Sequence, residues 1–273
     1  MKDDGPPAVV DSAFRSAEKR YRWRKRTPTD FTDVVDCASP AEARATRVRC
    51  GGGGADAYAI DGAPGLFVLP GALDLDAQAL LAASACREYA RSPFTNLTAL
   101  GAAPRAASAG PPDRALRWVT LGAHYDWSSR AYAAGRASPL PRSLAALAGA
   151  LAARVGESLD AEAAIVNYYA PGATMGGHVD DAENDRTKAL VSLSVGCSCV
   201  FLFGGPTRDA APVALFLRSG DACVLSGPAR DCYHGVPRVL EGTCPARLSR
   251  ALDADLRDYL GGTRINVNVR EVG

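Results

Sequence analysis

Residues 263–270 alternate strictly between apolar and polar side chains, and few folds accommodate such a stretch. The two sets are Ile265, Val267 and Val269 on one side, and Arg264, Asn266, Asn268 and Arg270 on the other. Because successive side chains of a strand point to opposite faces, the pattern predicts a strand with one face in the core. Two arginines on the opposite face indicate a surface that binds a ligand.

Upstream of this strand, short predicted strands recur from residue 165 onward, separated by Gly, Pro and Asp turns at a spacing of roughly 8 to 12 residues, as in a jelly roll. Helical patterns precede them at residues 11–26, 74–90 and 140–155, and an Ala/Gly-rich stretch at 36–65 predicts a flexible connection. We therefore expect a mainly β fold with flanking helices (α+β) forming one compact unit. Its predicted parts are a disordered tail at 1–10, an N-terminal extension at 11–158 and a jelly-roll core at 159–273.

A candidate metal site lies in the segment Met175-Gly-Gly-His-Val-Asp180. In an extended backbone, His178 and Asp180 face the same side and can bind one ion. This pair alone has a simple alternative, a turn histidine beside a solvated aspartate. His234 follows another predicted strand and completes two histidines and one carboxylate, the set that holds non-haem Fe(II) with open positions.

The order of these motifs resembles the AlkB family of Fe(II)/2-oxoglutarate dioxygenases. The resemblance rests on the motifs His178-x-Asp180, His234, Arg264-x-Asn-x-x-x-Arg270, Asn167-Tyr-Tyr169, Phe201-Leu-Phe-Gly-Gly205 and Ser219-Gly-Asp221. Upstream, Arg117-Trp-Val-Thr-Leu-Gly-Ala-His-Tyr-Asp-Trp127 resembles the AlkB homologue 1 type specifically. The resemblance implies a double-stranded β-helix core with a nucleotide-recognition lid.

The resemblance also implies the cofactors Fe(II), 2-oxoglutarate and O2. His178, Asp180 and His234 would be the catalytic metal ligands, and 2-oxoglutarate would chelate the iron. The residues implied to bind 2-oxoglutarate are Asn167, Tyr169, Arg264, Asn266 and Arg270. The two arginines are about 20 Å apart along a strand and cannot grip one carboxylate together. We assign Arg264 to the distal carboxylate, which its planar fork matches, and Arg270 to the metal end.

The substrate residues are expected in the lid and after the metal aspartate. Some relatives have an aromatic residue after the Leu-Gly of the lid, where this chain has Ala123, so Tyr125 or Trp127 would stack on an extruded base instead. The bacterial founder of the family has an acid two residues after its metal aspartate. Here Ala182 holds that position, flanked by Asp181 and Glu183.

A basic segment near the N-terminus is a second candidate for substrate contact. Arg22, Arg24 and Lys25 lie at the end of the helix predicted over residues 11–26, with Tyr21 and Trp23 interleaved. Basic residues among aromatics are typical of phosphate contact with base stacking. A solvated basic helix or a nuclear-localisation run explains the pattern equally well.

The whole-chain composition shows no general attraction to nucleic acid, because the net charge of the 273 residues is only +1. None of the eight cysteines forms a C-x-x-C pair, and no apolar run approaches the length of a membrane span. The first residues, Met1-Lys-Asp-Asp4, do not resemble a signal peptide. We expect an intracellular monomer in the nucleus or cytoplasm, with the mitochondrion as an alternative and no membrane association.

The predicted function is oxidative demethylation of N-methylated bases in nucleic acid, with release of formaldehyde, succinate and CO2. The base would be N6-methyladenine in DNA or a methylated base in tRNA. Two alternatives stay open. One is hydroxylation of a protein side chain or of C5-methylcytosine, and the other is a catalytically silent nucleic-acid-binding protein.

Overall fold

The computed structural model describes residues 11–23, 28–39, 44–48, 56–106 and 110–273. Its strands are β1 (Ala45–Val48), β2 (Ala57–Ile60), β3 (Ala63–Leu69), β4 (Trp118–Asp126), β5 (Ala131–Ser138), β6 (Ala163–Tyr169), β7 (Met175–His178), β8 (Leu190–Gly196), β9 (Ser198–Phe203), β10 (Val213–Leu217), β11 (Ala222–Leu225), β12 (His234–Leu240) and β13 (Arg264–Arg270). The α-helices are α1 (Ala13–Tyr21), α2 (Leu75–Arg87), α3 (Asn96–Ala99), α4 (Arg142–Ala153), α5 (Ala246–Ala251) and α6 (Ala254–Leu260), and η1 (Tyr89–Arg91) and η2 (Gly227–Asp231) are 3-10 turns.

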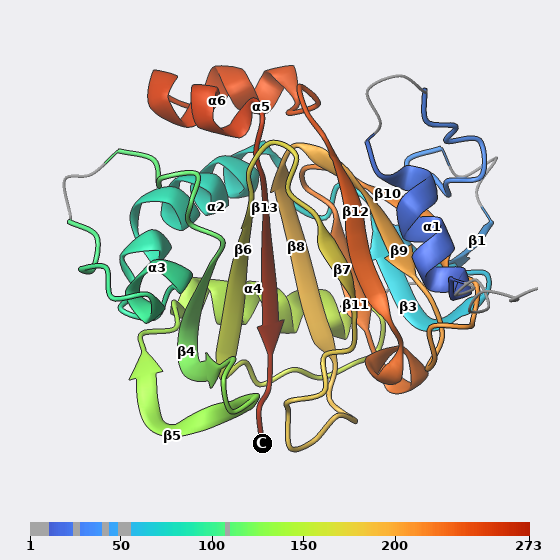
Figure 1. Ribbon diagram of the computed structural model, residues 1–273, viewed down its shortest axis with the longest axis horizontal. Coiled ribbons are helices and arrows are strands. Elements are labelled where there is room, and N and C mark those ends of the chain that lie inside the picture. The colour runs from blue at the N-terminus through green and yellow to red at the C-terminus, as the bar shows by residue number, and fades with distance from the viewer. Residues whose placement is uncertain (1–10, 24–27, 40–43, 49–55, 107–109) are drawn as a thin grey trace, which may run out of the picture.

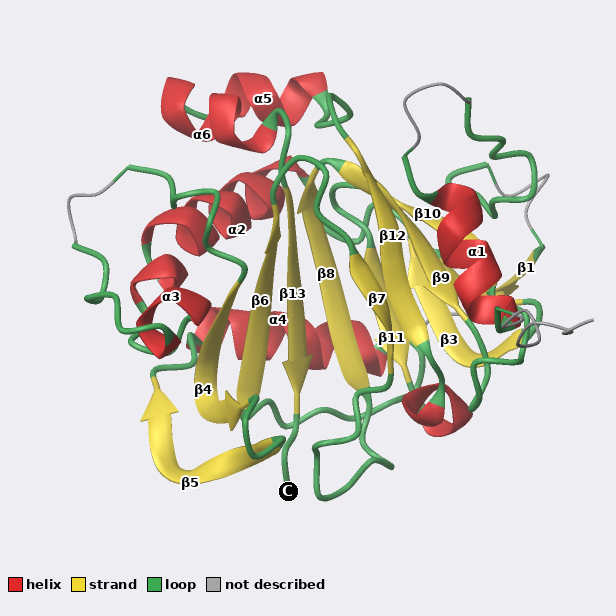
Figure 2. Ribbon diagram, in the orientation of Figure 1, coloured by secondary structure: helices red, strands yellow, loops and turns green. Residues whose placement is uncertain are grey.

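The strands form two sheets that face each other, as Figures 1 and 2 show. The larger has the order β1-β2-β3-β11-β8-β13-β6-β4-β5, and the smaller has β10-β9-β12-β7. Helices α2 and α4 cover the outer face of the large sheet, and α1 packs on the small one. This arrangement confirms the predicted mainly β fold with flanking helices and a jelly-roll core.

Strand β13 lies inside the large sheet, paired antiparallel with β6 and β8. Its apolar residues Ile265, Val267 and Val269 are fully buried in the helix-covered core, as their alternation predicts. Its polar face is turned toward the small sheet. Arg264 is nevertheless only 1% exposed, so this polar face lies inside the molecule between the two sheets.

Two sequence expectations about the N-terminal half are wrong. Helix α1 ends at Tyr21 rather than at residue 26, because Arg22 adopts an extended conformation with ψ 140°. Residues 36–65 are not simply a connection, because β1 and β2 extend the edge of the large sheet next to β3. The predicted disordered tail at 1–10 lies outside the described residues.

Candidate functional site

The two histidines of the predicted metal site lie directly opposite each other on paired strands. His178 ends β7 and pairs with His234 at the start of β12, and their ring centroids are 4.4 Å apart. Asp180 follows β7, with carboxylate oxygens 3.8 Å from Nε2 of His178 and 3.7 Å from Nε2 of His234. One ligand atom from each residue lies within 4.8 Å of the others. Across the described part of the chain, this is the one such group of three that can hold a metal ion.

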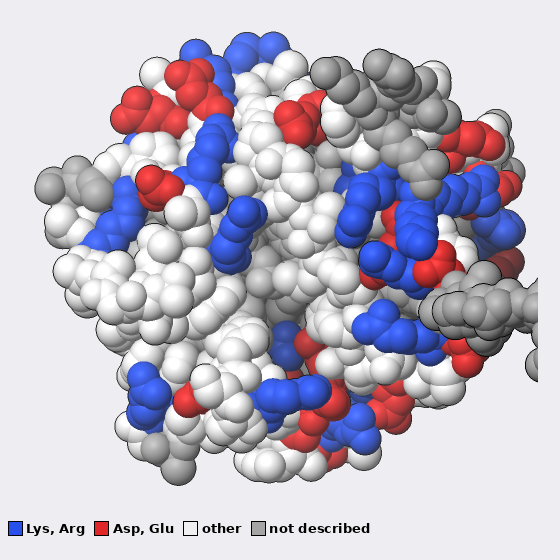
Figure 3. All heavy atoms as spheres, in the orientation of Figure 1, with Lys and Arg blue, Asp and Glu red and all other residues white. Residues whose placement is uncertain are grey.

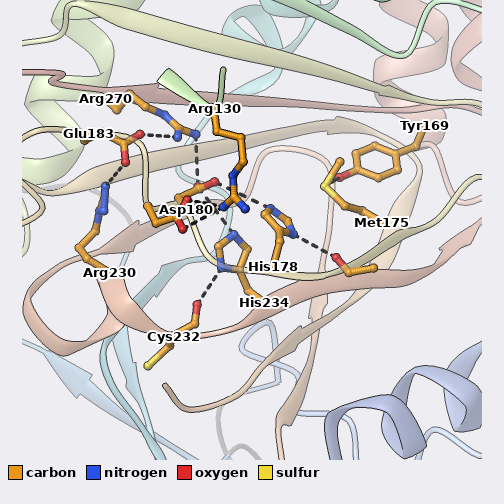
Figure 4. A network of polar contacts seen from close by, with 12 residues as sticks. Arg130, Tyr169, Met175, His178, Asp180, Glu183, Arg230, Cys232, His234 and Arg270 are labelled. Carbon is orange, nitrogen blue, oxygen red and sulfur yellow. Dashed lines mark hydrogen bonds and ion pairs between the residues drawn. The ribbon is translucent and has the colours of Figure 1, made fainter. Parts of the chain in front are cut away.

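Backbone carbonyls fix the orientation of both imidazoles (Figure 4). Nδ1 of His178 lies 3.0 Å from the carbonyl oxygen of Gly176, and Nδ1 of His234 lies 3.2 Å from that of Cys232. Because a carbonyl oxygen only accepts hydrogen bonds, these contacts favour the tautomer protonated at Nδ1. The Nε2 lone pairs then point toward Asp180, as metal binding requires.

The charges around the site keep these groups in the form that binds a cation. Burial would raise the pKa of Asp180, but Arg270 and the two histidines outweigh it and hold this pKa well below its usual range. Burial, together with His178, lowers the pKa of His234 to about 4. At neutral pH the site therefore contains a carboxylate and a neutral His234 imidazole.

Arg270 connects Asp180 to a second, fully buried acid. Its Nη2 donates to Asp180 at 3.3 Å, and its Nη1 donates to Glu183 at 2.6 Å. Arg230 also donates to Glu183 at 3.1 Å, and the hydroxyl of Tyr132 lies 3.3 Å away. We expected Glu183 to contact substrate, but its side chain is 0% exposed and is bound by two arginines. The structure corrects this expectation, because Glu183 accepts a hydrogen bond from Arg270 and holds that guanidinium in position.

Arg264 is a buried cation with unused hydrogen-bond donors. Its Nη2 donates to Oγ of Ser194 at 3.0 Å, and its guanidinium lies 5.1 Å from the ring centroid of Tyr169. Its Nε and Nη1 are buried without a partner. Leaving a guanidinium buried and unpaired is strongly unfavourable, so this position calls for an anionic ligand.

An inner cavity of about 30 Å³ connects Arg264 with the two histidines and Asp180. Tyr169, Asn266 and Asn268 also line it. The amide of Asn266 donates to Ser192 at 2.8 Å and to the carbonyl of Leu193 at 2.9 Å, which fixes its orientation. A five-carbon diacid needs more room than this. Met175 also lines the cavity, with its sulfur 3.7 Å from the hydroxyl of Tyr169, and its flexible side chain can move aside.

An outer cavity of about 450 Å³ opens from the metal site to the surface. Its lining includes the predicted residues Tyr125, Trp127, Asn167 and Asp181, and Figure 3 shows a hollow in the centre of this face. Arg130 from the lid donates to both carboxylate oxygens of Asp181 at 3.0 Å. The predicted lid residues therefore lie at the entrance to the metal site.

A family model described as the 2OG-Fe(II) oxygenase superfamily matches residues 65–270, which include every residue of this site. The chain belongs to this superfamily. Members of this oxygenase family use Fe(II), 2-oxoglutarate and O2, as the sequence predicts. The three converging ligands and the unpaired donors of Arg264 suit a metal ion and an anionic cosubstrate, respectively.

Several relatives of this chain are AlkB homologue 1 proteins, in agreement with the predicted type. The DNA N(6)-methyladenine demethylase ALKBH1A of Arabidopsis thaliana is 43% identical over 58% of this chain and 49% of its own. The nucleic acid dioxygenase ALKBH1 of Homo sapiens is 42% identical over 58% of this chain and 46% of its own. The chain thus spans about half the length of these relatives.

In two further comparisons, the match covers most of the other protein's length. The tRNA demethylase abh1 of Schizosaccharomyces pombe is 31% identical over 96% of both chains. A solved structure of OsALKBH1 matches with a TM-score of 0.59 and 22% identity, covering 76% of this chain and 97% of that one. At 22% identity, the likeness to OsALKBH1 shows a shared fold.

The basic segment at the end of α1 lies only partly within the described residues. Arg24 and Lys25 lie outside the described residues. Arg22 is exposed but lines a groove beside residues 171–174 and 237–241, apart from the outer cavity. On α1 itself, Arg15 pairs with Glu18 at 2.8 Å and Arg20 with Asp33 at 2.6 Å. Much of the helix's positive charge is therefore already paired within the protein.

Several residues near the site were not among the predicted ones. Asn268, Met175, Tyr132 and Arg230 line its cavities or contact its acids. Alternation along residues 264–270 already places Asn268 on the ligand face, whereas the others carry no local signal. None of the helices that the structure describes is long and apolar enough to cross a membrane.

Proposed function

We propose that the protein removes methyl groups from base nitrogens in nucleic acid, with N6-methyladenine in DNA or a methylated base in tRNA as substrate. One observation carries the proposal: His178 and Asp180, two of the three candidate metal ligands, line an open cavity whose lining also includes Tyr125 and Trp127. Aromatic residues at such an entrance suit a base that has left its stack. Relatives named as DNA and tRNA demethylases support the choice of nucleic acid.

In this proposal, His178, Asp180 and His234 hold Fe(II), and Arg264 forms a bidentate pair with the distal carboxylate of 2-oxoglutarate. Asn167 and Tyr169 contact the cosubstrate from β6, where Tyr169 lies opposite Arg264. Arg270 holds Asp180 in place as an anion. Fe(II), when bound with 2-oxoglutarate and O2, supplies the oxidation of the N-methyl carbon.

The atoms of the proposed reaction are all accounted for by O2, 2-oxoglutarate and the methylated base. One oxygen atom enters the methyl C–H bond, and the other enters 2-oxoglutarate, which leaves as succinate and CO2. The hydroxymethylamine product then breaks its C–N bond, giving formaldehyde and the free base nitrogen. The protein's part is to position the methyl group and exclude bulk water.

The test is incubation with Fe(II), 2-oxoglutarate and a panel of methylated oligonucleotides and tRNA, followed by mass analysis of the bases. We expect loss of the methyl group from one N-methylated base together with equimolar formaldehyde and succinate. Oxidation of C5-methylcytosine alone, or of a protein side chain alone, would assign the alternative hydroxylase function. Binding without any turnover would assign a silent binding protein.

A further inference from the structure

A second cavity, here called the side cavity, lies next to the outer cavity and has a volume of about 260 Å³. Its lining includes Phe94, Ala99, Trp118, His124, Asp126 and Arg136. Trp127 lines both the side cavity and the outer cavity, so the two cavities have one residue in common. Nothing in the proposed demethylation of a single base uses the side cavity.

A bend in β4 brings Trp118 and Trp127 together. Gly122 has φ +68°, a conformation that other residues rarely adopt, and the register of β4 with β5 shifts between Ala123 and Tyr125. A side chain at Gly122 would collide with the backbone oxygen of Glu162. The bend returns the end of β4 over its start, and Trp127 stacks on Trp118 with ring centroids 3.6 Å apart.

The side cavity has the chemistry of a base-binding site. Phe94 and His124 are stacked with centroids 4.2 Å apart, and burial lowers the pKa of His124, which keeps this ring neutral at physiological pH. The exposed guanidinium of Arg136 lies 5.1 Å from the Phe94 centroid. Asp126 lies at the edge and accepts hydrogen bonds from the backbone of its own turn. His124 and Arg136 both contact the Phe94 ring, so the aromatic surface left for a base is that of Trp118 and Trp127, which also line the side cavity. Aromatic surface beside a cation is the combination that holds an unpaired base and its phosphate.

We propose that the side cavity binds the base adjacent to the one that enters the outer cavity. The proposal rests on the proposed function, because it requires nucleic acid as the substrate. The shared residue supports it: Trp127 lines both cavities and stacks on Trp118, which lines the side cavity, so successive bases of an unpaired strand can enter the two neighbouring cavities. Arg136 then neutralises a phosphate beside the side cavity. The protein therefore recognises a short unpaired segment rather than an isolated nucleotide.

The first experiment measures binding of labelled single strands that contain one methylated base and an abasic position on its 5′ or its 3′ side. Mn(II) replaces Fe(II), so binding is measured without turnover. We expect one of the two abasic positions to weaken binding about tenfold, as loss of one base–aromatic stack does, and the other to have a smaller effect. If neither abasic position weakens binding of the strand, the proposal is overturned.

The second experiment fills the side cavity through Ala99→Trp, since Ala99 is an exposed residue at the end of α3 and lines this cavity. Leu100→Trp, at a neighbouring position that is 85% exposed and outside the lining, is the matched control. Ala99→Trp should bind the intact strand about tenfold more weakly and lose its response to the sensitive abasic position. Its thermal midpoint and its turnover of a free methylated nucleoside should match those of Leu100→Trp.

Arg136→Ala separates the phosphate contact from stacking. It should reduce the slope of log affinity against log salt by about 0.7, the value for one phosphate on a single strand, whereas Arg142→Ala on α4 should not. Wild-type affinity and abasic response in Ala99→Trp would overturn the side-cavity proposal while demethylation of the strand stands. Absence of turnover on every methylated nucleic acid would instead overturn the proposed function.

Discussion

Asp180 is the residue on which the charge balance of the metal site depends. It faces both histidines and accepts from Arg270, and its carboxylate stays ionised chiefly because the Arg270 guanidinium outweighs the effect of burial. We predict that Asp180→Ala abolishes 2-oxoglutarate-dependent oxygen consumption and weakens Mn(II) binding by at least a hundredfold, as loss of one of three ligands should. Electron paramagnetic resonance of Mn(II) measures the binding. Asp209→Ala, an exposed aspartate outside the site, is the control, and near-normal activity in Asp180→Ala would refute the metal assignment.

Arg264 allows a separate test of the cosubstrate site. Because Nε and Nη1 have no partner inside the protein, a planar fork is available to a carboxylate, and lysine offers only a point charge there. Arg264→Lys should raise the 2-oxoglutarate concentration at half-maximal rate at least tenfold and leave Mn(II) affinity nearly unchanged. Titration of 2-oxoglutarate measures the effect. An unaltered requirement would place this arginine outside the cosubstrate site.

At the scale of single residues, the sequence predicted which side chains would converge at the candidate site much better than it predicted their surroundings. His178, Asp180, Arg264 and Arg270 follow strand periodicity, which is a local property. The role of Glu183 could not be predicted, because its contacts Arg230 and Tyr132 come from distant parts of the chain and meet it only in the folded protein.

Helix α1 is the element whose role changes most between sequence and structure. Phe14 is fully buried, and a Cβ built at Gly177 would lie 2.5 Å from its ring. Glu18 accepts a hydrogen bond from the backbone N–H of Gly177 at 2.7 Å. Because His178 follows Gly177 directly, α1 holds the strand that carries one of the proposed metal ligands. Its basic composition fitted contact with nucleic acid, a solvated helix or a localisation run equally well, and gave no sign of this packing.

We therefore predict that Glu18→Ala weakens metal binding, although Glu18 lies outside the proposed ligand set. The substitution leaves the buried N–H of Gly177 without an acceptor, which costs about 1–3 kcal/mol. Mn(II) affinity should fall several-fold and the thermal midpoint should drop. Glu18→Gln retains a carbonyl acceptor and should restore most of both. Ser16→Ala, on the exposed side of the same helix, is the control. Equal metal affinity in Glu18→Ala and Ser16→Ala would show that α1 does not position His178.

Other elements show how far sequence periodicity extends. The helices predicted at 74–90 and 140–155 appear as α2 and α4, and Asp74 caps α2 by accepting from the N–H of Ala77. The region of β1 and β2 lacked a recognisable pattern, because its Ala- and Gly-rich composition is typical of connections and its order comes from pairing with β3. Strand pairing between distant segments is not encoded locally, and such edges are the hardest elements to predict.

For the whole molecule, the site between the two sheets links cofactor binding to stability. The large sheet contributes Arg264 and Arg270, and the small sheet contributes His178 and His234, so a bound metal and cosubstrate join both layers. A ligand that binds only the folded state at a hundred times its Kd adds about 2.7 kcal/mol to the free energy of unfolding. For a chain of this size, that corresponds to a rise in thermal midpoint of roughly 5–10 °C.

We predict such a rise when Mn(II) and 2-oxoglutarate are added together at saturating concentrations, measured by calorimetry or by the change in tryptophan fluorescence. Two variants separate the two contributions. Asp180→Ala should lose the increment that depends on Mn(II). Arg264→Met should retain that increment and lose the one from 2-oxoglutarate, because methionine cannot pair with a carboxylate.

Without ligands, Arg264→Met should melt no lower than the wild type, since replacing an unpaired buried cation by an apolar side chain removes an unfavourable desolvation cost. A ligand-free Arg264→Met that melts well below the wild type would contradict this account, because it would mean that the guanidinium already stabilises the empty site through Ser194 and Tyr169.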